Sequence, residues 1–527
     1  MRRSDTLDRR SFLQYAAGAA AAAAVPPIPS APRHPVQSAS QAFELEEATI
    51  ASLQEGLRAG RYTTRALCEA YLARIAALNR SGPTLRSVLE TNPDALAIAD
   101  RLDGERKARR VRGPLHGIPV LIKDNIATAD RMMTAAGSLA LVAAAPPRDA
   151  VVVERLRAAG AVILGKTNLS EWANFRGTQS SSGWSGRGGQ CQNPYALDRN
   201  PCGSSSGTGA AIAANFAAVG VGTETDGSIV CPASACSLVG VKPTLGLIGG
   251  GGIIPIAHSQ DTAGPMCRTV TDAAILLGVL AGKDYSASLD PNGLKGARIG
   301  VARKKCFGYS PEADALVEAA IDVLRRQGAT IVDPADIPHM GEYDDSEFIV
   351  LLYEFKADVN AYLTEWAPHG PMRTLADLIA FNEANKSLEL KYFGQETFIQ
   401  AQEKGPLTDQ AYLDALEKDR RLSRTEGLDV ALAQNNLDAI VAPTGSPPWP
   451  TDLVNGDHFL GASSTPAAVA GYPSVSVPVG YSFGLPVGMS FIGRASSEPT
   501  LLKLAFAYEQ AAKPRRPPRF LPTADLS

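Results

Sequence analysis

Three consecutive serines lie between glycines in residues 200–209, NPCGSSSGTG, so the first question is what chemistry their hydroxyls serve. A glycine-rich phosphate-binding loop ends in Gly-Lys followed by Ser or Thr, whereas this loop continues into alanine without a lysine. A flexible linker is also disfavoured, because residues 210–219 form an alanine-rich run that favours burial. The loop therefore indicates nucleophilic catalysis, in which a base takes the serine proton.

Histidine and lysine are the two candidate bases. The six histidines leave a Ser-His-Asp triad open, but none occurs in a GxSxG context: His34, His116, His258, His339, His369 and His458. Lys123 ends the apolar run VLIK, where burial can lower its pKa by several units from about 10.4. The alternative for Lys123 is an ordinary solvated surface charge.

Short apolar runs and periodic segments predict the elements that position these residues. Asn92 followed by Pro93 predicts a helix N-cap with proline at the first helical position. Buried strands are predicted at residues 118–122, 161–164, 218–223, 330–332, 439–442, 475–479 and 487–492, and helices at 64–79, 310–328 and 499–511. Their alternation predicts an α/β fold with helices on a central sheet. Residues 342–436 are predicted to be mostly helical and are a possible cap.

The composition is that of a globular protein, with 527 residues, 45% hydrophobic and 20% charged. A net charge of −3 gives no indication of a nucleic-acid partner. Seven cysteines without CxxC spacing argue against a zinc site, and we expect neither a metal nor a cofactor. Cys191 and Cys202 flank a loop and could form a disulfide, which the sequence leaves open.

Residues 1–42 are predicted to be an export signal and spacer, and residues 43–527 the functional domain. DRRSFLQ followed by AAGAAAAAAV resembles a twin-arginine signal, whereas a chance arginine pair is the alternative. The alanine-rich run is too short to span a bilayer. We therefore expect an exported protein, periplasmic or secreted, without stable membrane association after export. The sequence determines neither the position of the cleavage site nor the oligomeric state.

The segments HGIPVLIKDN, GKTNLSEW and DTAGPM, with the long block from GSSSGTG to GVKPT, resemble the amidase signature family. The similarity covers most of the chain after residue 43 and is sharpest at 113–266. The resemblance implies a large mixed sheet flanked by helices, with a mainly helical region in the C-terminal half. It also implies an amide hydrolase that releases ammonia through an acyl-enzyme.

The resemblance further implies a Ser-Ser-Lys triad, in which Lys123 is the base and Ser228 the nucleophile. Ser204 matches the bridging serine, whose preceding peptide bond is cis in the family, and the spacing of 228 − 204 = 24 residues agrees with the family pattern. The implied oxyanion hole consists of backbone N–H groups of Thr225, Asp226, Gly227 and Ser228. Gly203 and Ser205 are expected to support the loop.

Two departures from the common family pattern resemble the peptide amidase branch, which removes the C-terminal carboxamide of peptides. Asp226 replaces a glycine before the nucleophile, and Val230 replaces an arginine two residues after it. The expected substrate is a peptide amide or another small amide. We expect the Asp226 carboxylate to repel a free peptide carboxylate.

Three other functions remain open. The glutaminase subunit of a tRNA-dependent amidotransferase shares the signature block, but an export signal argues against that cytosolic role. A broad aliphatic or aryl amidase would use the same triad. An inactive secreted binding protein is the alternative of another class, although all three triad positions are filled.

Overall fold

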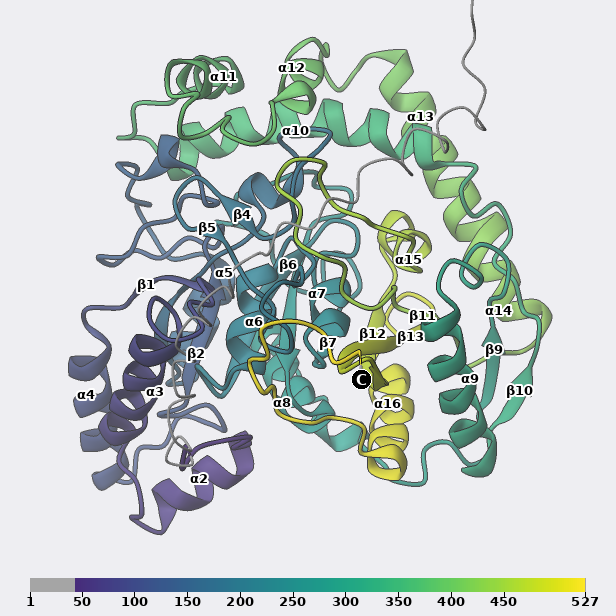
Figure 1. Ribbon diagram of the computed structural model, residues 1–527, viewed down its shortest axis with the longest axis horizontal. Helices are drawn as coiled ribbons and strands as arrows, with labels where there is room; N and C mark the ends of the chain where they lie inside the picture. Colours follow the sequence, from purple (N-terminus) through teal and green to yellow (C-terminus); the bar gives the residue numbers. More distant parts are fainter. Residues whose placement is uncertain (1–42, 527) are drawn as a thin grey trace, which may run out of the picture. The chain divides into compact units, whose positions relative to one another are not determined.

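The computed structural model describes residues 43–526, which fall into two units. Residues 43–46 belong to the first, in which the Glu46 amide donates to the Phe43 carbonyl at 2.9 Å. The second, from Glu47 onward, is built on an eleven-stranded sheet in the order β1-β3-β2-β6-β8-β7-β12-β13-β11-β9-β10 (Figure 1). Strands β3, β2 and β6 run parallel, as do β11, β9 and β10, while the other pairings are antiparallel. The expected mixed sheet is confirmed.

The sheet strands are β1 (Val88–Thr91), β2 (Pro119–Lys123), β3 (Val162–Thr167), β6 (Val219–Glu224), β7 (Val239–Lys242), β8 (Thr262–Cys267), β9 (Arg298–Val301), β10 (Thr330–Val332), β11 (Ala439–Pro443), β12 (Ser474–Ser482) and β13 (Leu485–Ile492). A separate hairpin pairs β4 (Trp184–Ser185) with β5 (Gly189–Gln190). Every residue of β2, β3 and β6 is buried, which is typical of strands covered by helices on both faces.

Helices follow most of these strands and flank the sheet. They are α2 (Ile50–Arg58), α3 (Thr64–Leu78), α4 (Ala95–Lys107), α5 (Val151–Ala158), α6 (Ser206–Ala213), α7 (Val230–Ala235), α8 (Val270–Ala281), α9 (Pro311–Arg326), α10 (Asp344–Trp366), α11 (Leu375–Ala384), α12 (Glu396–Gln402), α13 (Gln410–Arg420), α14 (Asp429–Gln434), α15 (Thr465–Ala470) and α16 (Glu498–Ala512). Helix α9 begins as predicted, because the Ser310 hydroxyl accepts from the Ala313 amide at 3.3 Å.

The region 342–436 contains α10 to α14, so its expected helical content is confirmed. Figure 1 shows α10, α11, α12 and α13 grouped at the top of the view, and α10 packs against α11, α12 and α13. Its action as a cap remains a prediction.

The predicted N-cap at Asn92 is wrong. Helix α4 begins at Ala95, after Asp94. The Asn92 side chain instead accepts from the Asp94 amide at 2.9 Å and donates to the Ile163 carbonyl at 2.9 Å. Asparagine therefore forms a local turn here and ties it to β3, a long-range contact that a local pattern does not reveal.

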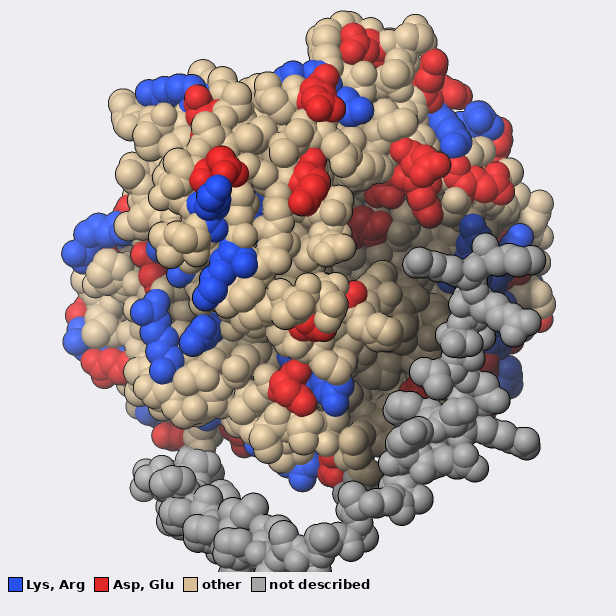
Figure 2. All heavy atoms as spheres, turned by 45° about the horizontal axis from the view of Figure 1, so that its top comes forward, with Lys and Arg blue, Asp and Glu red and all other residues tan. Residues whose placement is uncertain are grey.

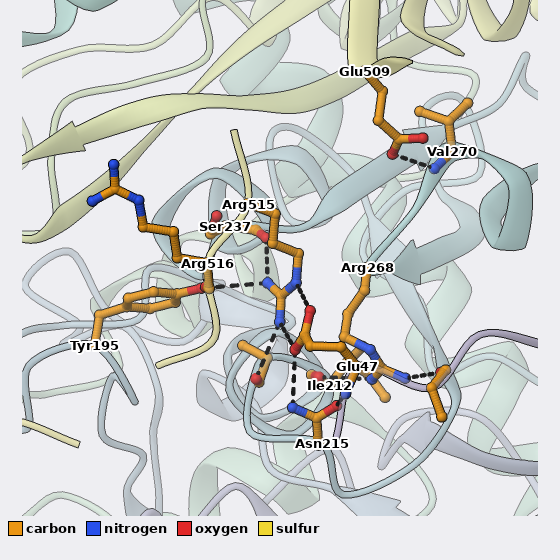
Figure 3. A network of polar contacts seen from close by, with 12 residues as sticks. Glu47, Tyr195, Ile212, Asn215, Ser237, Arg268, Val270, Glu509, Arg515 and Arg516 are labelled. Carbon is orange, nitrogen blue, oxygen red and sulfur yellow. Dashed lines mark hydrogen bonds and ion pairs between the residues drawn. The ribbon is translucent and has the colours of Figure 1, made fainter. Parts of the chain in front are cut away.

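A polar network connects the C-terminal segment to the end of α6 (Figure 3). Arg515 makes a two-pronged ion pair with Glu47, at 2.6 and 2.8 Å, and donates to the Ser237 carbonyl at 2.5 Å. Asn215, just after α6, donates to the same Glu47 carboxylate at 3.0 Å. In Figure 3 the neighbouring Arg516 points away from this network. Arg515 thus joins segments that are far apart in sequence.

On the face shown in Figure 2, basic side chains lie mainly towards the left and acidic ones towards the upper right, with uncharged residues between them. Within residues 43–526, no helix combines the length and the apolar character needed to cross a bilayer.

We expect Arg515→Ala to lower the free energy of unfolding by about 3 kcal/mol, because it leaves the partly buried Glu47 carboxylate without its cation. Urea unfolding followed by circular dichroism would measure the change. The matched control is Arg516→Ala, which removes a cation over the Tyr481 ring and should change stability by less than about 1 kcal/mol. Equal losses in the two variants would contradict the assignment.

Candidate active site

Lys123 occupies the last position of β2, and its side chain is fully buried. Its Nζ atom lies 2.8 Å from Ser204 Oγ, 2.9 Å from Thr223 Oγ1 and 3.2 Å from the Thr223 carbonyl oxygen. Burial lowers the pKa of the amine from 10.5 to about 7, although the carboxylates of Asp261 and Glu224 act in the opposite direction. An uncharged amine can donate to both Thr223 oxygens and keep its lone pair for the Ser204 hydroxyl.

Ser204 lies in the loop before α6, where the Gly203–Ser204 peptide bond is cis. The Ser204 carbonyl accepts from the Ser170 amide at 3.0 Å, which fixes the loop beside β3. At Gly203 an added Cβ would lie 2.2 Å from Ser170 Oγ, so a side chain does not fit without displacing that serine. The close packing of the loop therefore requires glycine at this position.

Ser205 connects the Ser204 loop to the turn that carries Ser228. Its amide donates to the Ser228 carbonyl at 3.1 Å, and its hydroxyl donates to the Thr223 carbonyl at 3.0 Å. The same hydroxyl accepts from the Thr223 amide at 3.2 Å. These contacts bring the loop and the turn together at the end of β6.

Ser228 lies in the turn between β6 and α7, with 7% of its surface exposed. Glu224, at the end of β6, closes this turn, because its Oε2 atom accepts from the Ile229 amide at 2.6 Å and the Val230 amide at 3.0 Å. The sequence analysis assigned no role to Glu224, although it lies within the block from GSSSGTG to GVKPT. The sequence feature that could have indicated this role is the position of Glu224, four residues before Ser228.

The backbone of residues 225–228 offers unused hydrogen-bond donors. Among the described residues, none of these four amides donates to a protein acceptor. Gly227 has a φ of +77°, a left-handed conformation that favours glycine. Such a turn can direct several N–H groups at one oxyanion.

Asp261, the first residue of the DTAGPM segment, lies behind the turn. Its Oδ1 accepts from the Thr225 hydroxyl at 2.6 Å, and its Oδ2 accepts from the amides of Ile256 and Ala257 at 2.7 and 3.0 Å. Burial raises the pKa of the Asp261 carboxyl to about 7. Sequence reasoning included this aspartate in the family pattern but missed its contact with Thr225.

Asp226 lines the main cavity next to Ser228. Its Oδ2 atom accepts from the Thr465 hydroxyl at 2.6 Å, while the buried Oδ1 atom has no protein partner. Burial raises the pKa of this carboxyl. Asp226 therefore places a carboxyl group, held by hydroxyl groups, beside the candidate nucleophile.

The disulfide possibility at Cys191 is wrong, because Cys202 pairs with Cys231 instead. Cys231 is the second residue of α7, three residues after Ser228, so the bridge joins the Ser204 loop to the Ser228 turn. Cys191 is a free, buried thiol. The pairing depends on the long-range approach of two loops, which spacing along the chain does not encode.

A cavity of about 600 Å³ opens beside these residues. Its lining comes from loops before and after the central strands and includes Ser204, Asp226, Ser228, Trp449, Asp457 and Phe459. Among the described residues, no lysine or arginine lines it, and the charged groups of its lining are the two aspartates. None of the five described histidines lines this cavity either, and His34 lies outside the described residues. The histidine-based triad therefore finds no support in this geometry.

The N-terminal segment, residues 1–42, resembles a known export signal. A sequence model of the twin-arginine translocation pathway signal matches residues 6–26, so the chain carries this export signal. The match falls outside the described residues, on the segment predicted to be the export signal.

The rest of the chain is similar to proteins of known class. The structure of native peptide amidase from Stenotrophomonas maltophilia matches with a TM-score of 0.87 and 52% identity, covering 91% of this chain and 99% of that one. A probable amidase of Arabidopsis thaliana is 43% identical over 507 residues, 92% of this chain and 93% of the relative. A glutamyl-tRNA(Gln) amidotransferase subunit of Chloroflexus aurantiacus is 35% identical over 487 residues, 89% of this chain and 97% of that protein. The Amidase family model matches residues 66–502, and this chain belongs to that family as an amidase acting on amide C–N bonds.

Proposed function

We propose that this exported amidase removes the C-terminal carboxamide of peptides through an acyl-enzyme at Ser228. The observation that carries the proposal is the buried amine of Lys123, 2.8 Å from Ser204 Oγ, beside a cavity lined by both serines. The likeness to the peptide amidase of Stenotrophomonas maltophilia supports the substrate class.

In the acylation step, Ser204 transfers its proton to Lys123 while it takes the proton of Ser228. The Ser228 oxygen attacks the amide carbonyl carbon, and the carbonyl electrons move to the oxygen. Backbone N–H groups of residues 225–228 donate to this oxyanion, and each such donor typically contributes about 3–4 kcal/mol. Lys123 then returns its proton through Ser204 to the leaving nitrogen, the C–N bond breaks, and ammonia departs.

In the deacylation step, water replaces Ser228 as the group that loses a proton. The relay takes that proton through Ser204 to Lys123, and the resulting hydroxide attacks the ester carbonyl. Collapse of the second tetrahedral intermediate breaks the C–O bond, and the proton returns to Ser228. The free peptide acid is the second product.

The charges of the cavity favour an amidated peptide end over a carboxylate. The unpartnered Oδ1 atom of Asp226 can accept a hydrogen bond from the carboxamide N–H₂ group, which a carboxylate lacks. An ionised product acid would instead meet the aspartate without a neighbouring cation on the cavity wall. Repulsion of the product would therefore assist its release.

The glutaminase alternative is favoured by the similarity to the amidotransferase protein of Chloroflexus aurantiacus. Free glutamine, however, carries an α-carboxylate, and no basic residue lines the cavity to bind it. The export signal also separates this chain from cytosolic tRNA. A binding protein without activity is disfavoured because the three relay positions are filled and lie within one site.

The relay predicts an acid limb in the pH profile of kcat/KM. Because Lys123 acts as a base only when it is uncharged, activity should rise with pH through about 7 and level off above it. Initial rates of ammonia release between pH 5 and 9 would measure the midpoint. Asp261 also has a pKa of about 7, so Asp261→Asn tests the assignment. Loss of the acid limb in that variant would assign it to the aspartate instead.

Ser204→Ala should lower turnover of peptide amides by about 10³-fold, because both chemical steps lose their proton relay. Pre-steady-state measurement of acylation and deacylation should show both steps slowed. Ser206→Ala is the matched control at the first position of α6, where the hydroxyl lies 3.4 Å from Ser170 Oγ and outside the cavity. A change in KM without a change in kcat for Ser204→Ala would contradict proton transfer through Ser204.

Lys123→Met should abolish measurable turnover while the protein remains folded. At pH 7 the lysine side chain is protonated in the unfolded chain, whereas in the native protein its pKa is lowered to about 7. Burial of this amine therefore lowers the free energy of unfolding at pH 7. The variant should therefore have a thermal midpoint no lower than that of the wild type. Turnover above about 1% of wild type near neutral pH would rule out Lys123 as the base.

Asp226→Asn should bind the peptide acid about tenfold more tightly, because it removes a negative charge beside the product carboxylate. Product inhibition constants for matched peptide acids would measure the change. Asp322→Asn removes an exposed charge on α9, outside the cavity lining, and should leave these constants unchanged. Equal inhibition of the wild type and Asp226→Asn would contradict the repulsion.

A further inference from the structure

A second cavity, of about 340 Å³, lies next to the one that holds the serines. Ala173, Thr225 and Ile256 line both cavities, so only these residues separate them at that point. The exposed residues Gly250 and His258 mark the outer end of the second cavity. Its lining also includes the buried Asn125 and Thr223, which mark the inner end.

The inner end of this cavity reaches the surroundings of the Lys123 amine. Thr223 Oγ1 lies 2.9 Å from Lys123 Nζ and accepts from Asn125 Nδ2 at 3.0 Å. One side chain therefore separates the second cavity from the base of the proposed relay.

The lining of the second cavity suits a small hydrogen-bond donor that carries positive charge. Asn125 is 2% exposed, and its Oδ1 atom has no hydrogen-bond partner although it is buried. Asp261 and Asp358 also line the cavity, and no lysine or arginine does. A buried acceptor without a partner is costly unless a ligand or water supplies a donor.

His258 does not make the cavity cationic overall. Its Nδ1 atom lies 2.8 Å from Asp358 Oδ2, and its Nε2 atom lies 3.4 Å from Glu354 Oε1. The two carboxylates of Asp358 and Glu354 carry more negative charge than the one imidazolium of His258 carries positive charge. Both ring nitrogens face carboxylates, so His258, Glu354 and Asp358 form an ion-paired cluster.

The proposed reaction produces a ligand of this kind. After acylation the acyl group remains on Ser228 and occupies the first cavity, while ammonia is released beside Ser204, which returned its proton. Ammonia has to leave before water can react, and at neutral pH it takes up a proton to become ammonium. A polar exit that bypasses the bound acyl group would meet this requirement.

We propose that the second cavity receives the leaving ammonia and binds it as ammonium, or binds another small primary ammonium ion. Asn125 Oδ1 accepts one hydrogen at the inner end, and Asp358 provides negative charge at the outer end. The proposal rests on the proposed acyl-enzyme reaction, because that reaction supplies the ammonia.

The first test is the pattern of product inhibition. Ammonium chloride should inhibit hydrolysis of a peptide amide without competing with it, and Asp358→Asn should weaken that inhibition, which reversal of acylation alone would not cause. Sodium chloride at the same ionic strength is the control for salt. Purely competitive inhibition would place ammonium in the first cavity and overturn the proposal.

Asp358→Asn should raise the inhibition constant for ammonium by about five- to tenfold and leave KM for the peptide amide unchanged. The variant keeps an oxygen that can accept from the His258 amide. Asp322→Asn changes the net charge equally at an exposed site on α9, outside both linings, and should leave the inhibition constant unchanged. Equal constants for Asp358→Asn and the wild type would contradict the role of this carboxylate.

A binding measurement separates this proposal from the proposed function. Calorimetric titration with methylammonium chloride would use enzyme whose Ser228 has been labelled by a serine-directed covalent inhibitor. Binding should persist after labelling and weaken in Asp358→Asn. Loss of binding on labelling would overturn the second site, whereas failure of the wild type to release ammonia from peptide amides would count against the proposed function alone.

Discussion

The exclusion of water from the Lys123 amine is the physical constraint on which the site depends. A lysine is a base only after it loses its proton, and its ordinary pKa would keep it charged at neutral pH. The centre of the sheet provides the required environment, because β2 lies between β3 and β6 and is buried along its whole length. The fold thus determines the chemistry of the amine before any substrate binds.

Two buried carboxylates lie close enough to oppose this effect, and their own hydrogen bonds explain why burial still dominates. Glu224 accepts from two amides after the nucleophile, and Asp261 accepts from Thr225 and from two loop amides. Donors other than the lysine therefore stabilise these groups. The same hydrogen bonds hold the backbone turn of Ser228, so each carboxylate serves the geometry of the turn while the pKa of the amine stays near 7.

The sequence predicted the parts of the protein that local patterns encode. The apolar runs before Lys123 and Glu224 predicted the central strands, and family motifs indicated which side chains would meet. Strands β7 and β8 went unrecognised because VGVK and TAGPMC carry glycine or proline and lack a long apolar run. The disulfide partner and the roles of Glu224 and Asp261 depend on loops that meet only in three dimensions.

The bridge between Cys202 and Cys231 also sets the conditions under which the site becomes complete. Disulfides persist in oxidising compartments and are rare in the cytosol, and this chain carries a signal for export. Without the bridge, hydrogen bonds such as that from the Ser205 amide to the Ser228 carbonyl, together with side-chain packing, hold the two serine-bearing segments together. Oxidation after export adds a covalent link across the mouth of the reaction centre. Maturation of this enzyme is therefore coupled to its passage out of the reducing interior of the cell.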